Sequence, residues 1–244
     1  MGASQSASTL ESVNFHADLA AGWEERYAKK SFRARIAVLE ECLRDEELAG
    51  SNWLDAGCGT GTLSRWLAAH GCQVLGVDAA ASMVTAAEKL SQDWSIERLP
   101  KFARVETIAC LAAEDASFDG ILCSSVLEYV EQPDRCLTEF ARILKPGGAL
   151  LVSVPNRDSM VRKGQVASHR LGVRIGQNWL PFIRHSHHQY GAREFGKLLS
   201  QSGFVVESTI PFGSPLPSFI QRLPFGGSLL MFKASKIEHS QGPA

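Results

Sequence analysis

The stretch WLDAGCGTGT, residues 53–62, decides how this chain is interpreted. It begins as a short apolar strand, passes the acidic residue Asp55, and enters a turn that contains Gly57, Gly59 and Gly61. Glycine permits positive φ and lets the backbone approach a ligand closely. A helix is expected over residues 63–69. A strand, a glycine turn and a helix N-terminus together form a general nucleotide-binding device.

The spacing of the glycines separates two classes of nucleotide ligand. Dinucleotide-binding turns follow G-x-G-x-x-G and hold a pyrophosphate at the helix N-terminus. Here the glycines follow G-x-G-x-G, Thr62 stands at the next position, and Asp55 precedes the turn. A carboxylate there repels a pyrophosphate and suits a cationic ligand. Glycine turns also close ordinary strand–helix units, so the complete string carries more weight than the glycines alone.

The composition is typical of one globular domain. The chain has 244 residues, of which 45% are hydrophobic and 21% charged, enough to fill a core. The formal net charge of −1 indicates no whole-protein attraction to nucleic acid. No apolar run approaches the ~20 residues of a membrane span. The six cysteines lack C-x-x-C spacing, which favours reduced thiols in a cytoplasmic protein over a disulfide framework or a zinc site.

Strand and helix patterns alternate after the glycine turn, which is typical of a parallel sheet. Helices are expected at 82–90, 133–144 and 192–202. After the first strand at 52–56, further strands are expected at 73–77, 104–108, 118–124, 149–154 and 204–210, and an antiparallel one at 228–232. The predicted fold class is therefore α/β: a Rossmann-like seven-stranded sheet, mostly parallel with one antiparallel strand, with helices on both faces. The domain is expected to span residues 50–236.

Other segments interrupt or flank this alternation. Residues 1–14 and 237–244 are small and polar and are expected to be disordered tails. Apolar residues at helical spacing over 15–49 predict an N-terminal helical cap. Residues 157–189 hold many Arg and His without clear periodicity, so we expect an irregular lid over the substrate. Residues 211–227, rich in Pro, Gly, Ser and Phe, are expected to be a loop.

Asp78 ends the second expected strand. At that place an α/β nucleotide fold hydrogen-bonds the ribose diol of its ligand. The alternative is a helix N-cap, since a helix follows within a few residues. The glycine turn upstream favours the ribose role.

Basic residues cluster just before the core domain, at Lys29, Lys30, Arg33 and Arg35. They form a solvated helix face, or else Arg33 or Arg35 pairs with a carboxylate of the ligand.

Five landmarks occur in order: LDAGCGTG, Asp78, Glu106, SFDGILCSSVLEYV and ILKPGG. Together they resemble the class I S-adenosylmethionine-dependent methyltransferases of the methyltransferase 11 type, whose ligand carries an ammonium and a sulfonium. Residues 105–134 and 144–157 look like the ubiquinone-biosynthesis O-methyltransferase branch. That branch has E-x-x-E-H after the fourth strand, linked to a divalent metal and quinol substrates. Here Ser125, Glu128 and Tyr129 match those positions, so no metal site is carried over.

The resemblance implies in-line methyl transfer from S-adenosylmethionine to a nucleophilic oxygen, nitrogen or carbon. It implies that Asp55 and the backbone around Gly57 hold the methionine end and that Asp78 takes the ribose hydroxyls. Glu106 and the backbone after it then frame the adenine, and the backbone near Ser124 faces the reacting group. With Arg33 added, the candidate cofactor-binding residues are Arg33, Asp55, Gly57, Cys58, Gly59, Gly61, Asp78, Ala79, Met83, Glu106, Thr107, Ile108 and Ser124.

A hydroxyl acceptor must lose a proton, which requires a general base. His185, His187 and His188 are candidates because histidine titrates near neutral pH. His187 and His188 are the predicted catalytic residues, since they stand near a histidine of the quinol-type branch. The alternative is a solvated or structural cluster. Glu128 either orients the acceptor or merely begins a helix.

Aromatic residues in the lid and in the 211–227 loop suggest a partly apolar pocket for a small hydrophobic or aromatic acceptor. They include Trp179, Phe182, Phe212 and Phe225, and ordinary packing explains them equally well. Three rival functions remain open at this point: a tRNA-modifying methyltransferase of the same fold, an NAD-dependent oxidoreductase with a degenerate turn, and a non-catalytic binder.

Overall fold

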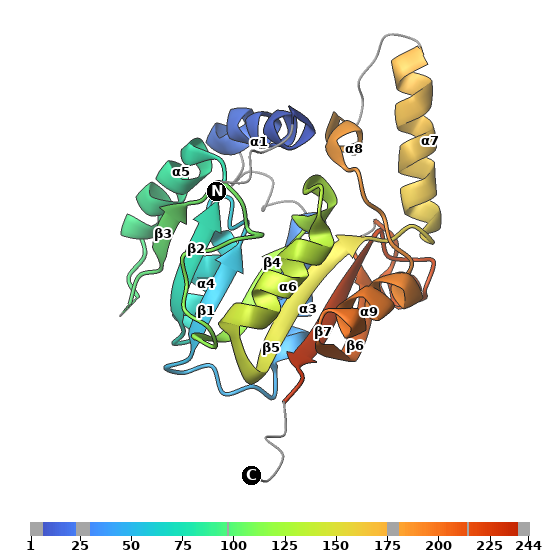
Figure 1. The fold of residues 1–244 in the computed structure, drawn as a ribbon. Coiled ribbons are helices and arrows are strands. Elements are labelled where there is room, and N and C mark those ends of the chain that lie inside the picture. The colour runs from blue at the N-terminus through green and yellow to red at the C-terminus, as the bar shows by residue number, and fades with distance from the viewer. Residues whose placement is uncertain (1–6, 23–29, 97, 175–180, 214, 239–244) are drawn as a thin grey trace.

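A seven-stranded sheet forms the centre of the protein, in the order β3-β2-β1-β4-β5-β7-β6 (Figure 1). The computed structural model describes residues 7–22, 30–96, 98–174, 181–213 and 215–238. Strands β1 to β5 pair in parallel, and β7 runs antiparallel to both β5 and β6. This confirms the predicted Rossmann-like sheet. The strands are β1 Asn52–Ala56, β2 Gln73–Asp78, β3 Lys101–Arg104, β4 Phe118–Ser124, β5 Leu144–Pro155, β6 Phe204–Phe212 and β7 Leu229–Lys236.

Helices cover both faces of the sheet, as Figure 1 shows. Buried side chains of α3 and α4 form one core cluster with the sheet, and those of α6 and α9 form another. The helical elements are α1 Ala7–Leu19, η1 Ala20–Gly22, α3 Lys30–Leu43, α4 Thr62–Ala69, α5 Ala81–Gln92, η2 Leu127–Tyr129, α6 Pro133–Ile143, α7 Met160–Arg174, α8 Pro181–His185, α9 Ala192–Gln201 and α10 Ser218–Gln221. Within this described part of the chain, none of the helices has the length and apolar character needed to cross a membrane.

The pleat of the central strands sends alternate side chains into the two core clusters. In β1, Trp53 joins the α3–α4 cluster and Leu54 joins the α6–α9 cluster. By the same alternation Asp55 points to the Trp53 side, where α4 lies. An acidic side chain therefore enters a buried layer directly before the glycine turn.

Several strands differ from their expected boundaries, and the largest differences are at β3, β5 and β7. The third strand was expected at 104–108 but spans Lys101–Arg104. Its last residue, Arg104, pairs with Asp78, the last residue of β2. Strand β5 begins at Leu144 rather than at 149, so it includes the glycine turn in which Gly147 has φ +72°.

The prediction of an irregular lid over 157–189 is wrong for two parts of that segment, which form α7 and α8. The buried side chains described in α7 are polar, those of Arg162 and His169. The apolar residues Met160, Leu171 and Val173 are exposed. Because the apolar residues are not on the buried face, hydrophobic periodicity gives no sign of this helix.

Two further segments expected to lack regular structure contain it. Residues 7–14 lie in α1 instead of a disordered tail, and Ser12 is buried. Contacts of α1 with α5 and α8 order a segment whose small polar composition suggests disorder. Within 211–227, β6 continues to Phe212 and a short helix, α10, follows.

Glycine at position 120 is required by packing against Trp53. A Cβ at Gly120 would lie 2.3 Å from a ring atom of the buried Trp53. We expect Gly120→Ala to lower the free energy of unfolding by about 1–3 kcal/mol, because overpacking forces side chains and backbone to shift. Gly196→Ala is the matched control, since a Cβ there meets nothing within 4 Å. In helix α9 it should raise stability by about 0.5–1 kcal/mol. Urea unfolding of both variants tests this, and equal effects would contradict it.

Candidate functional site

The turn after β1 depends on backbone conformations that favour glycine. Gly57, Gly59 and Gly61 have φ of +77°, +54° and +77°, a region that L side chains rarely adopt. The backbone N–H groups of Gly57 and Cys58 donate to the carbonyl of Val77 at 2.8 and 3.0 Å. These two bonds fasten the start of the turn to β2.

The glycine turn also touches the segment after β4. A Cβ at Gly57 would lie 2.3 Å from Val126 Cγ2. The missing side chain therefore lets the turn approach the residues that follow the fourth strand. Two stretches far apart in the sequence meet at the carboxyl ends of adjacent parallel strands, where ligands of open α/β sheets bind.

Asp55 is a buried carboxylate at the start of this turn. It is 2% exposed, and Ser64 Oγ of α4 donates to its Oδ2 at 2.6 Å. Burial raises the pKa of Asp55 from its usual 3.8 to about 7; the Ser64 bond opposes this shift, and the charge of Asp78 adds to it. A buried acid of this kind is ionised at lower cost when a cationic ligand group lies beside it.

Asp78 holds the turn together from the end of β2. Its Oδ2 accepts the Gly59 N–H at 2.9 Å, and its Oδ1 accepts the Ala80 N–H at 2.9 Å. Burial raises its pKa, while these backbone bonds and the charge of His16 act in the opposite direction. Ala80, not Asp78, is the N-cap residue of α5. The carboxylate thus bridges the glycine turn and the start of α5.

The remaining candidate cofactor residues lie in two groups. Cys58 and Met83 are buried, and Ala79 is half-buried between β2 and α5. Glu106, Thr107 and Ile108 follow β3 rather than belonging to it; Glu106 is exposed and Ile108 buried. The first group adjoins the turn, whereas the second is a loop at the end of the neighbouring strand.

Arg35, rather than Arg33, lies at the end of β4. Arg33 is exposed, whereas Arg35 is half-buried and donates from Nη2 to Ser125 Oγ at 3.1 Å. Ser125 has φ +57°, unusual outside glycine, and its N–H donates to Ser153 Oγ at 3.0 Å. Ser124 Oγ lies 3.3 Å from the same Ser153 hydroxyl. Serine hydroxyls from β4 and β5 and an α3 arginine therefore meet at this edge.

Helix α1 crosses above the carboxyl ends of the strands, between α5 and α8 (Figure 1). Ser82 Oγ of α5 donates to the carbonyl of Ala17 at 3.1 Å. On the other side, the Phe15 ring stacks on His185 at 4.6 Å between centroids, and His16 meets Tyr129 edge-on at 4.6 Å. The helix links the glycine-turn half of the sheet to the α8 segment.

The predicted catalytic histidines reach this region through their backbone. The N–H groups of His187 and His188 donate to the Glu128 carbonyl at 2.8 and 3.4 Å. The His187 side chain is exposed and that of His188 half-buried. The buried ionisable residue at this point is Glu128, 3% exposed.

The aromatic residues expected to line the acceptor pocket lie in different parts of the structure. Phe212 belongs to the α3–α4 core cluster, and Phe225 is half-exposed beside the start of α7, with its carbonyl accepting the Met160 N–H at 3.0 Å. Trp179 lies outside the described residues, as does the side chain of Phe182. Two aromatic residues that were not predicted to line the pocket, Phe15 and Tyr129, make ring contacts with His185 and His16 above the strand ends.

Three site residues escaped the sequence analysis: His16, Ser153 and Arg162. Each occupies a position where pattern gives no signal, since Ser153 interrupts an apolar strand and Arg162 fills the buried side of α7. Tertiary contact alone brings them together.

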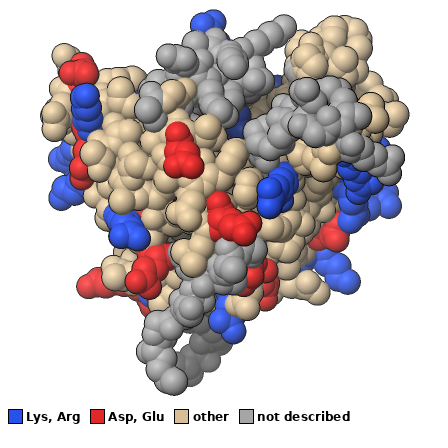
Figure 2. Space-filling model, turned by 90° about the horizontal axis from the view of Figure 1, so that it is seen from above, with Lys and Arg blue, Asp and Glu red and all other residues tan. Residues whose placement is uncertain are grey.

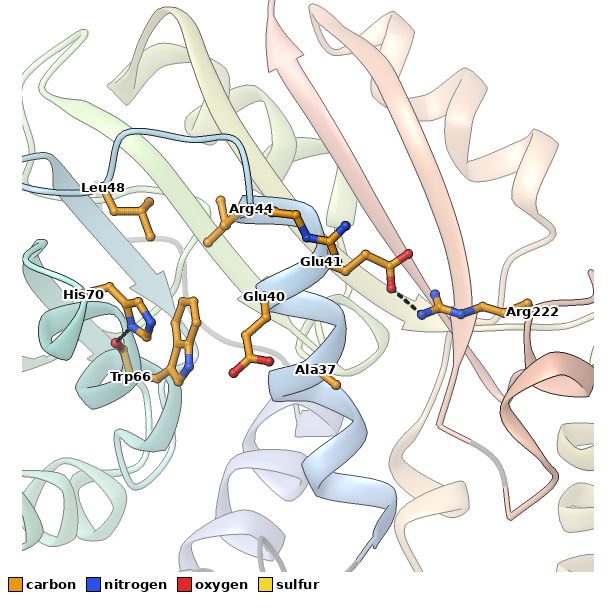
Figure 3. Close-up of a pocket in the computed structure, with 9 residues that line it drawn as sticks. Ala37, Glu40, Glu41, Arg44, Leu48, Trp66, His70 and Arg222 are labelled. Atoms are coloured by element: carbon orange, nitrogen blue, oxygen red, sulfur yellow. Dashed lines mark hydrogen bonds and ion pairs between the residues drawn. The ribbon is translucent and has the colours of Figure 1, made fainter.

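The surface charge and a separate hollow give weaker indications of a functional site than these strand ends do. Seen from above in Figure 2, uncharged residues cover much of the face, with Lys, Arg, Asp and Glu spread among them. A separate open hollow of about 450 Å³ lies between α3, α4 and Arg222, where Arg222 pairs with Glu41 and the Trp66 and His70 rings lie 3.9 Å apart (Figure 3). It contains none of the predicted site residues. In the portion of the chain that the structure covers, no three His, Cys, Asp or Glu side chains are grouped to hold a metal ion.

Comparison with known proteins agrees with this geometry. A family model described as a methyltransferase domain matches residues 24–209. Ubiquinone biosynthesis O-methyltransferases from Xanthomonas oryzae pv. oryzae are 40% identical over 112 residues, 46% of each chain. One from Coxiella burnetii is 37% identical over 111 residues, again 46% of each. The chain thus spans about half the length of the curated relatives it matches.

Solved structures share the fold at low identity. The methyltransferase solved with the Haloferax volcanii Trm112 methyltransferase activator has a TM-score of 0.69 at 18% identity, covering 95% of this chain and 99% of that one. Magnesium protoporphyrin IX methyltransferase from Synechocystis PCC 6803 with bound S-adenosylmethionine has a TM-score of 0.66 at 19% identity, covering 97% and 100%. Since the family model covers well over half of the sequence, the chain belongs to the class I S-adenosylmethionine-dependent methyltransferases.

Proposed function

We propose that the protein transfers a methyl group from S-adenosylmethionine to an oxygen, or less favourably a nitrogen, of a small hydrophobic or aromatic acceptor. Family membership decides the reaction class against the NAD-dependent oxidoreductase. The single observation that supports a small acceptor is the position of α1, whose Phe15 and His16 rings contact His185 and Tyr129 above the strand ends. A site covered in this way suits a compact molecule.

The residues around the glycine turn fit the methyl donor. The buried carboxylate of Asp55 and the half-buried one of Asp78 lie where a cationic ligand with a ribose is expected, and Gly57 leaves room for backbone approach. In our proposal Asp55 and the turn hold the methionine end, Asp78 takes the ribose hydroxyls, and Glu106 with Thr107–Ile108 frames the adenine. When bound, the donor supplies a methyl group already activated by a positive sulfur. The protein then contributes mainly position.

The curated relatives bear on which atom accepts the methyl group. The curated matches are named as ubiquinone biosynthesis O-methyltransferases, which supports oxygen as the acceptor atom and an aromatic ring as its carrier. Ser125 and Tyr129 stand where that branch has an acid and a histidine in its metal motif. These replacements argue against the same metal-assisted chemistry. A cytoplasmic location remains part of the proposal, since the six cysteines are free thiols.

One observation favours a second candidate, methylation of RNA. Residues 157–189 contain six Lys or Arg and one Asp, an excess that attracts phosphates. The covered strand ends and the dispersed charge of Figure 2 favour the small acceptor instead.

Asp78→Ala should weaken binding of S-adenosylhomocysteine by about 10-fold or more, because charge-assisted hydrogen bonds contribute about 1.5–3 kcal/mol. Asp78→Asn should lose less, since its amide oxygen can still accept one backbone bond. Asp93→Ala, an exposed acid at the other end of α5, is the matched control. Calorimetry measures all three, and unchanged affinity in Asp78→Ala would remove the ribose assignment.

The contribution of Asp55 to the free energy of unfolding should fall as pH rises through the acidic range. The pKa of Asp55 is 3.8 when unperturbed and about 7 in the folded protein, so between these values the folded state binds more protons than the unfolded state. The free energy of unfolding therefore declines over this range and levels off above it. Asp55→Asn should reduce the slope by up to about 1.4 kcal/mol per pH unit. Urea unfolding at several pH values tests this; an identical slope in the variant would contradict it.

Labelled S-adenosylmethionine offered with small phenols, nucleosides and tRNA tests the acceptor. We expect methylation of a phenol and neither of the other classes, because the covered site admits compact aromatic molecules. Methylation of polar acceptors alone would overturn the proposal. Salt-sensitive retention and methylation of tRNA would establish the second candidate.

A further inference from the structure

We infer that the carboxylate of Glu128, rather than His187 or His188, receives the proton of an acceptor hydroxyl. This inference rests on the proposed function, because it assumes that the acceptor binds at the carboxyl ends of β4 and β5. It names both a catalytic residue and a class of acceptor, a molecule that presents an acidic hydroxyl group.

The first observation is an incompletely satisfied buried carboxylate. Glu128 is 3% exposed, and its Oε2 has no hydrogen-bond partner among the residues that the structure describes. Leaving a buried acceptor without a donor costs free energy. A ligand hydroxyl would supply the donor that the described residues do not provide.

The second observation is location. Glu128 lies in η2, two residues after Val126, whose side chain packs against the position of Gly57. The same short segment contains Ser125 with φ +57°, a strained conformation of the kind that gathers at functional sites. Burial is the main cause that raises the pKa of Cys123 in β4, and Cys136, Glu128 and Asp55 add smaller electrostatic contributions, so both acids lie near this strand. One belongs to the cofactor side and the other lies toward α7 and α8.

The groups facing Glu128 allow it to gain and lose a proton. Burial raises its pKa from 4.5 to about 7, and the charges of Arg162 and Arg35 oppose this shift. A base whose pKa lies near the working pH is effective in both directions. Ionisable groups from several adjoining elements interact electrostatically with it: Arg35 of α3, Cys123 of β4, Tyr129 of η2, Arg162 of α7 and Tyr190 before α9.

The neighbouring histidines have a different role in this arrangement. The backbone N–H groups of His187 and His188 bind the carbonyl of Glu128. Arg162, whose Nη2 donates to Ser186 Oγ at 3.0 Å, joins α7 to the same stretch. The segment 186–188 therefore holds the backbone of Glu128, and the His187 side chain is exposed.

The chemical step balances without another reactant. The acceptor oxygen forms a bond to the methyl carbon while the methyl–sulfur bond breaks and leaves its electron pair on sulfur. The hydroxyl proton passes to Glu128 Oε2, and solvent takes it after the products leave. The sulfonium becomes a neutral thioether, so charge is conserved.

The test compares wild type, Glu128→Gln and the exposed control Glu131→Gln, each saturated with S-adenosylhomocysteine. The probe is 4-nitrophenol, whose phenolate absorbs visible light. In wild type the bound phenol should ionise at a higher pH than in water, because the carboxylate of Glu128 lies beside it and disfavours a second negative charge; Glu128→Gln should reduce that shift and Glu131→Gln should keep it. With labelled S-adenosylmethionine and phenols, Glu128→Gln should lose about 100-fold or more in rate.

A second readout distinguishes a structural role. If Glu128 mainly stabilises the fold, Glu128→Gln will unfold at a lower temperature across the pH range. Our inference expects equal or greater stability, and a smaller decline between pH 4.5 and about 7. The inference is overturned if wild type leaves the probe's ionisation unchanged, or if Glu128→Gln retains both the shift and the rate. Failure of wild type to bind S-adenosylhomocysteine would instead overturn the proposed function itself.

Discussion

The structure depends on a backbone turn that non-glycine residues rarely adopt. Three alternate residues after β1 have positive φ, and β2 holds the amides of Gly57 and Gly59 through the Val77 carbonyl and the Asp78 carboxylate. Because Gly57 lacks a side chain, the turn also contacts Val126 after β4. One loop thereby fixes the relative positions of the ends of three parallel strands. The methyl-donor side and the proposed acceptor side of the site are consequences of that contact.

Buried acids at these strand ends represent a compromise between stability and function. Asp55, Asp78 and Glu128 are all desolvated, and burial raises the pKa of each. Such groups weaken the folded state at neutral pH, and proteins retain them where a ligand or a reaction needs them. Asp55 and Asp78 fit the cationic nucleoside of the family. Glu128 lies on the far side of the glycine turn and fits a role in proton transfer. The methyl donor does not require such a transfer, but a hydroxyl acceptor does.

The cover over the site combines segments from distant parts of the chain. Helix α1 spans from Ser82 of α5 to His185 of α8, and the lid segment returns through the Glu128 carbonyl to the end of β4. Most of these links are single hydrogen bonds or ring contacts rather than a broad apolar interface. Segments joined in this manner open at lower free energy than core elements, which suits a site that must admit an acceptor and release a product.

The sequence by itself determined the sheet and the methyltransferase family, and it supplied the residues proposed for the cofactor side. The glycine spacing, Asp55 and Asp78 are consecutive in a strand–turn–helix unit, so local chemistry is enough to identify them. The alternation of strand and helix patterns likewise predicted the parallel strands, and β7 was predicted to be antiparallel. The tertiary structure decided the rest: the helices at residues 7–19 and 160–174, the choice of Arg35 over Arg33 at Ser125, and the isolation of Glu128. Those features have polar or small residues on buried faces, and only long-range contact shows which of such residues are enclosed.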